Sequence, residues 1–208
     1  ERFRLGISAE LWETVGYPSV RDFLLQHPNF SLQIFPQDDE TLEQRLAQGH
    51  LDAAVITQFQ NRSMFHIDPF VSYREHLVGA RDYIEASGMQ SPADILDSTL
   101  FDFSESFECI GTWLKKNDPA LLPTLRSRRP HLVIKDHRLM LPMLQERGLA
   151  MIPEFMVESA GLTQAFPKAK PTNIGIDLAT RKKHNHTQLQ VAFLGCLVQA
   201  SKYLRRCL

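Results

Sequence analysis

The first quarter of the chain alternates between two patterns of apolar positions, one typical of strands and one typical of helices. Residues 3–8, 30–35 and 51–56 are short apolar or alternating runs that predict strands. Between them, apolar side chains recur at helical spacing, first at Val20, Phe23 and Leu24 and then at Leu42 and Leu46. Strands that alternate with helices through short connections form parallel sheets with right-handed crossovers, so this part predicts an α/β unit.

The same alternation begins again further along the chain. Residues 65–80 predict two strands on either side of 72–75, and Ser91-Pro92 marks a helix start. Further strands are expected at 99–103, 131–135, 149–152 and 172–179, and further helices at 109–116, 136–147 and about 187–206. Pro142 lies inside one of these helices and predicts a kink or a new helix start. Two similar α/β lobes imply a cleft, and open α/β sheets bind ligands at the carboxyl ends of their strands.

Composition narrows the class of protein. The 208 residues carry 23 Lys plus Arg against 24 Asp plus Glu, a net charge of -1, which argues against a chain that grips nucleic acid by itself. No apolar run approaches the length that spans a bilayer. Three cysteines are too few for a disulfide scaffold and favour a reducing compartment. The chain opens on Glu1 without an initiator Met or a signal peptide, so we interpret it as a piece of a longer protein.

Four motifs in a fixed order resemble one family, the LysR-type transcriptional regulators, and within it the effector-binding domain. They are RLGIS at 4–8 leading to FLLQHPNF at 23–30, LAQGHLDAAV at 46–55, DYIEASG at 82–88 followed by SPADIL at 91–96, and RGLAMIPE at 147–154. The second is similar to the family's L-x-x-G-x-L-D-x-A-V, and the fourth to its G-x-G-I-A-x-L-P. The resemblance covers essentially the whole chain.

The resemblance implies a two-lobed α/β fold of the periplasmic-binding-protein type 2 class, each lobe a mixed sheet flanked by helices. Lobe I would hold residues 1–80 plus 172–208, and lobe II residues 81–171. The family's winged helix-turn-helix is absent from this chain, so promoter DNA would be bound only through that missing N-terminal part. The resemblance further implies a cytoplasmic homodimer, possibly a tetramer at full length, in which Tyr17, Val20, Arg21 and Leu24 face Leu139 and Met143 of a partner.

The resemblance also implies a small-molecule effector, held by hydroxyls and backbone N–H groups at strand ends. The residues that follow predicted strands are Ser8, Ala9, Glu10, Thr57, Phe103, Ser104, Asp136 and His137. Ser8, Ser104 and Asp136 are equally explained as helix caps. Glu10, Glu105 and Asp136 favour a cationic or amino-bearing effector, whereas helix N-termini favour an anion, and both possibilities stay open here.

Other functions have less support from the sequence. The main alternative is a solute-binding protein of a transporter with the same fold, although three free cysteines and the regulator motifs weigh against it. The chain carries none of the common hydrolase, nucleotide-binding or zinc-protease motifs, so neither an enzyme nor a cofactor is expected. His184 and His186 have no acidic or thiol partner nearby, so no metal site is predicted. Cys109 begins a predicted helix and is a weak redox candidate, opposed by Glu105 and Glu108.

Overall fold

The computed structural model describes residues 1–182 and 185–199, and its chain divides into two compact units. Unit 1 consists of Glu1–Ser72 together with the chain from Ile174 onward, and unit 2 is Tyr73–Asn173. Both divisions fall inside long strands, β4 (Phe65–Ala80) and β9 (Thr172–Arg181). The first lobe boundary expected from the sequence, after residue 80, coincides with the end of β4. The contacts divide the chain eight residues earlier, between Ser72 and Tyr73 in the middle of that strand.

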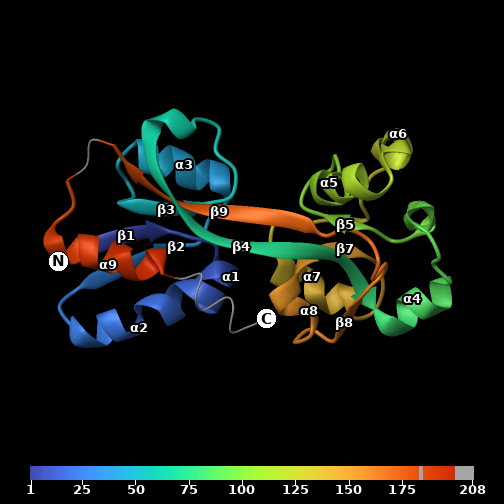
Figure 1. Ribbon diagram of the computed structural model, residues 1–208, viewed down its shortest axis with the longest axis horizontal. Helices are drawn as coiled ribbons and strands as arrows, with labels where there is room; N and C mark the ends of the chain where they lie inside the picture. Colours follow the sequence, from blue (N-terminus) through green and yellow to red (C-terminus); the bar gives the residue numbers. More distant parts are fainter. Residues whose placement is uncertain (183–184, 200–208) are drawn as a thin grey trace. The chain divides into compact units, whose positions relative to one another are not determined.

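Unit 1 is built on the parallel sheet that the apolar pattern predicts. Strand β1 (Arg2–Gly6) pairs in parallel with β2 (Ser31–Phe35) and with β3 (Ala53–Ile56), and β9 joins β3 in the antiparallel direction. The helices are α1 (Ala9–Leu11), a π-helical turn (Trp12–Gly16), α2 (Tyr17–Gln26), α3 (Asp39–Ala47) and α9 (Gln188–Val198). Helix α3 covers one face of the sheet, and α2 and α9 lie side by side on the other (Figure 1). Gly49 lies in the left-handed region (φ +79°) shortly after the end of α3, a conformation that glycine adopts readily.

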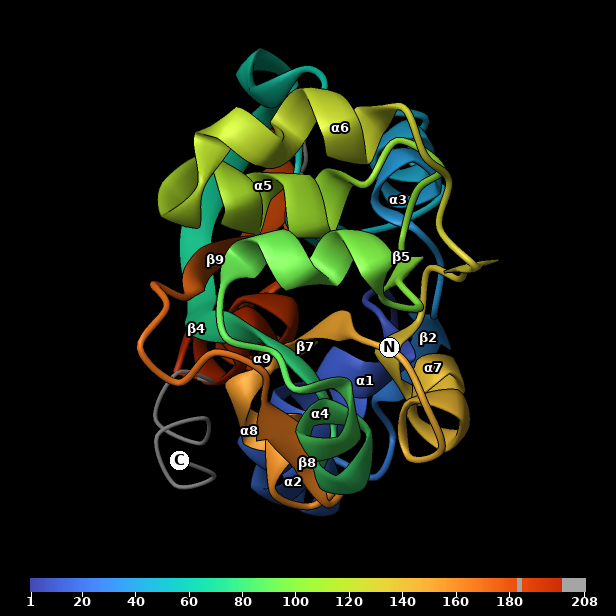
Figure 2. The same cartoon turned by 90° about the vertical axis from the view of Figure 1, so that its right-hand side faces the viewer.

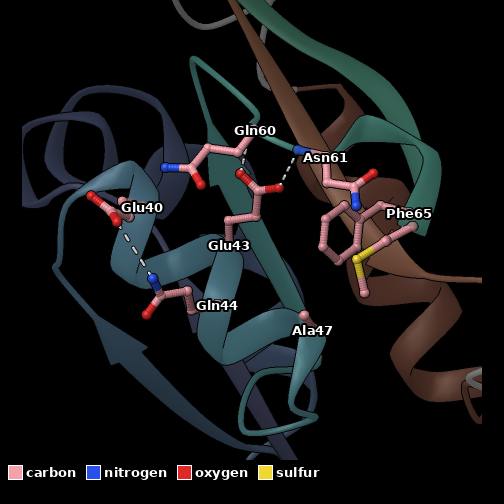
Figure 3. A pocket seen from close by; sticks show the side chains of 8 residues that line it. Glu40, Glu43, Gln44, Ala47, Gln60, Asn61 and Phe65 are labelled. Atoms are coloured by element: carbon pink, nitrogen blue, oxygen red, sulfur yellow. Dashed lines mark hydrogen bonds between the residues drawn. The ribbon is translucent and has the colours of Figure 1, made fainter.

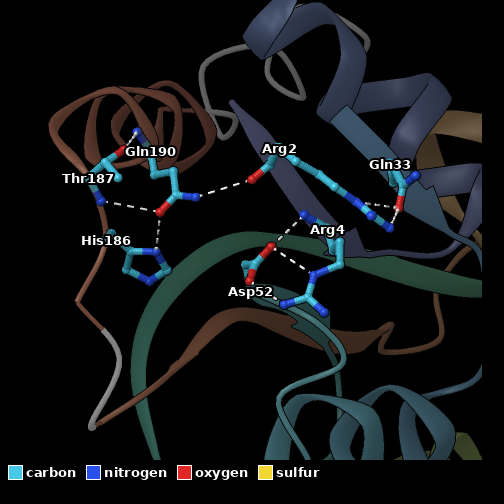
Figure 4. Close-up of polar contacts among 7 residues, drawn as sticks. All are labelled: Arg2, Arg4, Gln33, Asp52, His186, Thr187 and Gln190. Atoms are coloured by element: carbon cyan, nitrogen blue, oxygen red, sulfur yellow. Dashed lines mark hydrogen bonds and ion pairs between the residues drawn. The ribbon is translucent and has the colours of Figure 1, made fainter. Parts of the chain in front are cut away.

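An aromatic cluster holds α9 on this sheet. Phe193 is fully buried, and its ring centroid lies 4.9 Å from that of Phe3, 5.2 Å from that of Phe30 and 5.6 Å from that of Phe23. Gln190 anchors the start of α9, because its side-chain Nε2 donates to the carbonyl of Arg2 at 3.2 Å (Figure 4). The predicted final helix is confirmed over Gln188–Val198, and its remaining predicted positions lie outside the described residues.

The same edge of unit 1 carries a half-buried ion pair that joins two neighbouring strands. Arg4 on β1 contacts the carboxylate of Asp52, just before β3, with Nη2 2.7 Å from Oδ1 (Figure 4). The backbone N–H of Arg4 also donates to Asp52 Oδ2 at 2.8 Å. Asp52 belongs to the LAQGHLDAAV motif, so this motif's acid has a structural role in fixing how β3 enters the sheet.

Unit 2 combines antiparallel and parallel pairing. Strand β4 pairs in the antiparallel direction with β7 (Ala150–Pro153) and β8 (Leu162–Gln164), while β5 (Phe101–Asp102) pairs in parallel with β6 (Leu132–Val133). Its helices are α4 (Arg81–Ser87), a 3-10 helix (Pro92–Asp97), α5 (Glu108–Asn117), α6 (Leu122–Arg126), α7 (His137–Leu144) and α8 (Glu154–Val157). Figure 2 shows α5 and α6 next to each other, and Ile110, Trp113 and Leu114 of α5 are buried.

Two local predictions are corrected. Residues 65–80 form the single 16-residue strand β4 and not two strands, because Ser72 and Arg74 take the exposed positions of a continuing alternation and do not form a turn. Helix α7 runs from His137 through Pro142 without restarting, so the proline lies inside the helix.

The hydrogen-bonded order of the strands is β2-β1-β3-β9-β4-β7. Strand pairing therefore continues through β9 and β4, and the two units share these strands.

Candidate functional site

In unit 1, the predicted effector residues follow two neighbouring parallel strands. Ser8, Ala9 and Glu10 follow β1, and Thr57 follows β3, so they lie at the same edge of the sheet. Ser8 caps α1, because its hydroxyl oxygen accepts a hydrogen bond from the N–H of Leu11 at 3.3 Å. Glu10 is buried in the first turn of this helix, and Thr57 is half-buried. Ser8 therefore has the capping role that the sequence analysis gave as one explanation. The cap uses only the hydroxyl oxygen as an acceptor, so the hydroxyl hydrogen can still be donated to another group.

The backbone that follows β3 is held by a carboxylate from α3. Oδ2 of Asp39 accepts hydrogen bonds from the N–H groups of Thr57, at 3.0 Å, and Gln58, at 2.9 Å. Burial raises the pKa of Asp39, the two hydrogen bonds lower it, and the charges of Asp38 and Glu43 raise it further, with a raised pKa as the result. Asp39 thus fixes the position of Thr57.

Glu43, one turn further along α3, holds the next part of the same loop. Its two carboxylate oxygens accept from the N–H groups of Gln60 and Asn61, both at 2.7 Å (Figure 3). A hollow of about 150 Å³ lies between α3 and this loop, with Ala47, Met64 and Phe65 on its apolar side. All the residues that line this hollow belong to unit 1, and neither Ser8 nor Thr57 is among them.

In unit 2, Asp102 at the end of β5 organises the start of α5. Its side chain is 1% exposed, and its oxygens accept from the N–H groups of Ser104 at 3.2 Å, Cys109 at 3.3 Å and Ile110 at 2.9 Å. Burial raises the pKa of Asp102, and the backbone hydrogen bonds only partly offset this. Phe107 precedes α5 in the left-handed region (φ 56°), where a buried ring compensates for an unfavourable backbone.

The other predicted residues of unit 2 meet where β5 and β6 end. The ring of Phe103 lies 4.5 Å from the imidazole of His137, centroid to centroid. His137 is buried, with Nε2 3.6 Å from a carboxylate oxygen of buried Glu75 on β4. Ser104 Oγ accepts from the N–H of Glu108 at 3.1 Å, and Asp136 caps α7 through the N–H of Arg138 at 2.9 Å. Asp136 is therefore a helix cap, and Ser104 supplies the partner for the first N–H of α5, so the structural role that the sequence analysis weighed for both residues is present.

Cys109 does not have the surroundings of a reactive thiol. Burial raises its pKa far above the ordinary value, and the nearby carboxylates of Asp102 and Glu75 raise it further. A raised pKa opposes formation of the thiolate, which is the oxidant-sensitive form. Among the described residues, no group of three His, Cys, Asp or Glu side chains could hold a metal ion, and His184 lies outside them.

Three functional candidates escaped the sequence analysis. Asp102 and Asp39 hold the backbone at two of the predicted strand ends, and Glu75 contacts His137. An acid directly after a short apolar run signals Asp102, but the pairing of Glu75 with a helix 62 residues later has no local signature.

Comparison with known proteins gives the family. Residues 1–202 match the LysR substrate binding domain family. The HTH-type transcriptional regulator MetR of Salmonella typhimurium is 26% identical over 164 residues, which are 76% of this chain and 50% of MetR. The chain thus spans about half the length of the curated relatives that it matches. No helix in the described parts of the chain is long and apolar enough to cross a membrane.

Solved structures show the same fold. The effector-binding domain of QuiR in complex with shikimate has a TM-score of 0.74 at 15% identity, covering 97% of both chains. The full-length regulator LysG of Corynebacterium glutamicum, with bound effector arginine, has a TM-score of 0.71 at 12% identity, covering 97% of this chain and 68% of LysG. The predicted fold class is confirmed by these similarities.

Proposed function

The chain belongs to the LysR substrate-binding-domain family and is the effector-binding domain of a LysR-type transcriptional regulator, and we propose that it senses a small polar molecule between its two lobes. The family consists of regulators, which removes both an enzyme and a transporter's solute-binding protein from consideration. QuiR binds shikimate and LysG binds arginine, so small effectors are bound by relatives of this fold.

The proposed contacts are the residues that follow the strand ends in both units. Thr57 is held in place through its backbone by Asp39, so binding does not have to order this part of the chain first. Ser8 and Ser104 add hydroxyls, and Phe103 adds an apolar wall. Ala9 and Glu10 directly follow Ser8, and Asp136 and His137 come after β6, where the His137 ring contacts that of Phe103. Binding would favour one arrangement of the lobes, since a ligand shifts an equilibrium by its differential affinity for two states.

A hydroxyl deletion at Thr57 tests this proposal. A thermal-shift screen of the domain against a metabolite library that includes shikimate and L-arginine would first identify a stabilising ligand. Thr57→Val keeps the shape and removes the hydroxyl, so a ligand group left unpaired is expected to weaken binding about 5–150-fold by calorimetry. Ser8→Ala is expected to behave similarly, whereas Thr163→Val, at a half-buried threonine on β8, should leave the affinity unchanged. Unchanged affinity in Thr57→Val and Ser8→Ala would refute these contacts.

We propose that the full-length protein is a cytoplasmic homodimer or tetramer that binds promoter DNA through its N-terminal part. Leu139 and Met143 on α7 are 64% and 42% exposed, and Tyr17 and Leu25 on α2 are also exposed, which supports α2 and α7 as contact helices. Val20, included among the expected contacts, is fully buried in unit 1 and is corrected to a core residue. Sedimentation of this domain at about 100 µM is expected to show a dimer, and Leu139→Glu is expected to weaken that dimer, because burying an unpaired charge opposes association. A strict monomer at this concentration would contradict the proposed contact between α2 and α7.

A further inference from the structure

Backbone N–H groups after two of the predicted strands, β3 and β5, are already bonded to carboxylates of the protein. After β3, the N–H groups of Thr57 and Gln58 both donate to Asp39. After β5, the N–H groups of Ser104, Cys109 and Ile110 donate to Asp102. Each carboxylate comes from the same unit as the N–H groups that it binds, so this arrangement is internal to each unit.

The neighbouring donors at helix starts are engaged in the same way. The N–H of Glu108 donates to the Ser104 hydroxyl, that of Leu11 to the Ser8 hydroxyl and that of Arg138 to the Asp136 carboxylate. Helix N-termini bind anions because their N–H groups lack partners inside the helix. Here side chains of the protein supply those partners, two of them hydroxyls and one a carboxylate.

We infer that Asp39 and Asp102 are specificity-determining residues, which occupy the anion-binding positions at the ends of β3 and β5 and so exclude effectors that would bind there through a carboxylate or a phosphate. The inference rests on the proposed function and decides between the two effector classes that the sequence leaves open. The domain recognises its effector at these strand ends through uncharged or positively charged groups. Buried Glu10 after β1 carries the same sign of charge, which reinforces the exclusion.

Two physical effects produce the exclusion. An incoming anion would find the N–H groups of Thr57 and Gln58, and those of Cys109 and Ile110, already bonded, and it would have to displace a carboxylate held by two or more hydrogen bonds. It would also approach a fixed charge of its own sign, and at Asp102, which is 1% exposed, little water is present to weaken the repulsion. An amine, a guanidinium or a hydroxyl meets neither obstacle.

Inorganic phosphate is the probe that tests the inference without knowledge of the effector. The amide signals of Thr57, Gln58, Cys109 and Ile110 would be followed by NMR at pH 7.5 while phosphate replaces chloride at constant ionic strength. In the unsubstituted domain these signals are expected to stay in place. In Asp39→Ser, which frees a backbone donor and removes the charge, the signals of Thr57 and Gln58 are expected to shift with saturation in the millimolar range. Asp102→Ser should have the same effect at Cys109 and Ile110.

Asp38→Ser is the matched control, since it removes the same charge one residue earlier. Asp38 caps α3 through the N–H of Thr41 and does not bind the N–H groups of Thr57 or Gln58, so no phosphate site should open there. Should Asp102→Ser fail to fold, Asp39→Ser still decides the question. Saturable phosphate shifts in the unsubstituted domain would overturn the inference, and so would their absence in a folded Asp39→Ser. Neither result depends on the Thr57→Val affinity, so failure of the exclusion and failure of the effector contacts are distinguishable.

Discussion

Phe193→Ala is expected to lower the free energy of unfolding by about 3–5 kcal/mol, the usual loss when a buried phenylalanine is truncated. Its ring has no exposed surface and contacts the rings of Phe3, Phe23 and Phe30. Truncation removes these contacts and leaves a cavity between α9 and the sheet, because neighbouring aromatic rings anchored on β1 and α2 relax only in part. The loss should be visible as a lower urea midpoint.

Val191→Ala on the same helix is the control for this result. Val191 is 57% exposed, so its truncation changes little buried surface and is expected to shift stability by no more than about 0.5 kcal/mol. If the two variants had the same urea midpoint, the aromatic cluster around Phe193 would not be what holds α9 on the sheet of unit 1. A large loss in Phe193→Ala alone would show that the C-terminal part of the chain stabilises a unit formed mainly by its N-terminal part.

The elements of unit 1 could be predicted because their signals are local. The apolar stretch before Thr57 is buried on both faces as a strand, and Asp38, Pro18 and Gly49 mark helix ends by their own backbone chemistry. That α9 packs on unit 1 came from the family resemblance, since its apolar residues say only that the helix is buried. Phe193 finds its partners nearly the whole chain away, at Phe3.

The parts that could not be predicted depend on contacts between distant segments. The alternation in residues 65–80 fits one strand or two, and the choice is made by pairing with β7 and β8, far along the chain. The strand-end residues were placed correctly after their strands, but the pattern does not show which of their N–H groups are engaged. Asp39 reaches a loop 18 residues later, and a spacing of that size carries no periodic signal.

Asp102→Asn is expected to lower the free energy of unfolding by about 2–3 kcal/mol, because an amide cannot replace this carboxylate. Both oxygens of Asp102 accept hydrogen bonds: Oδ1 from Ser104 and Cys109, and Oδ2 from Ile110. In either orientation, the NH₂ of asparagine would face a backbone N–H and leave it without an acceptor. An unsatisfied buried donor costs about 1–3 kcal/mol, and the bonds lost are charge-assisted.

Asp39→Asn provides the contrast that isolates this cause. Both N–H groups held by Asp39, from Thr57 and Gln58, donate to the single atom Oδ2, so an asparagine oriented with its carbonyl oxygen there keeps both bonds. Its expected loss is within about 1 kcal/mol, and burial makes the charge of Asp39 itself unfavourable, which reduces the loss further. Urea unfolding of the two variants at pH 7 measures the difference. Equal losses would mean that charge, and not the number of oxygens engaged, decides how much each carboxylate stabilises the backbone that it holds. A larger loss in Asp102→Asn would show that the start of α5 depends on both oxygens of one buried side chain.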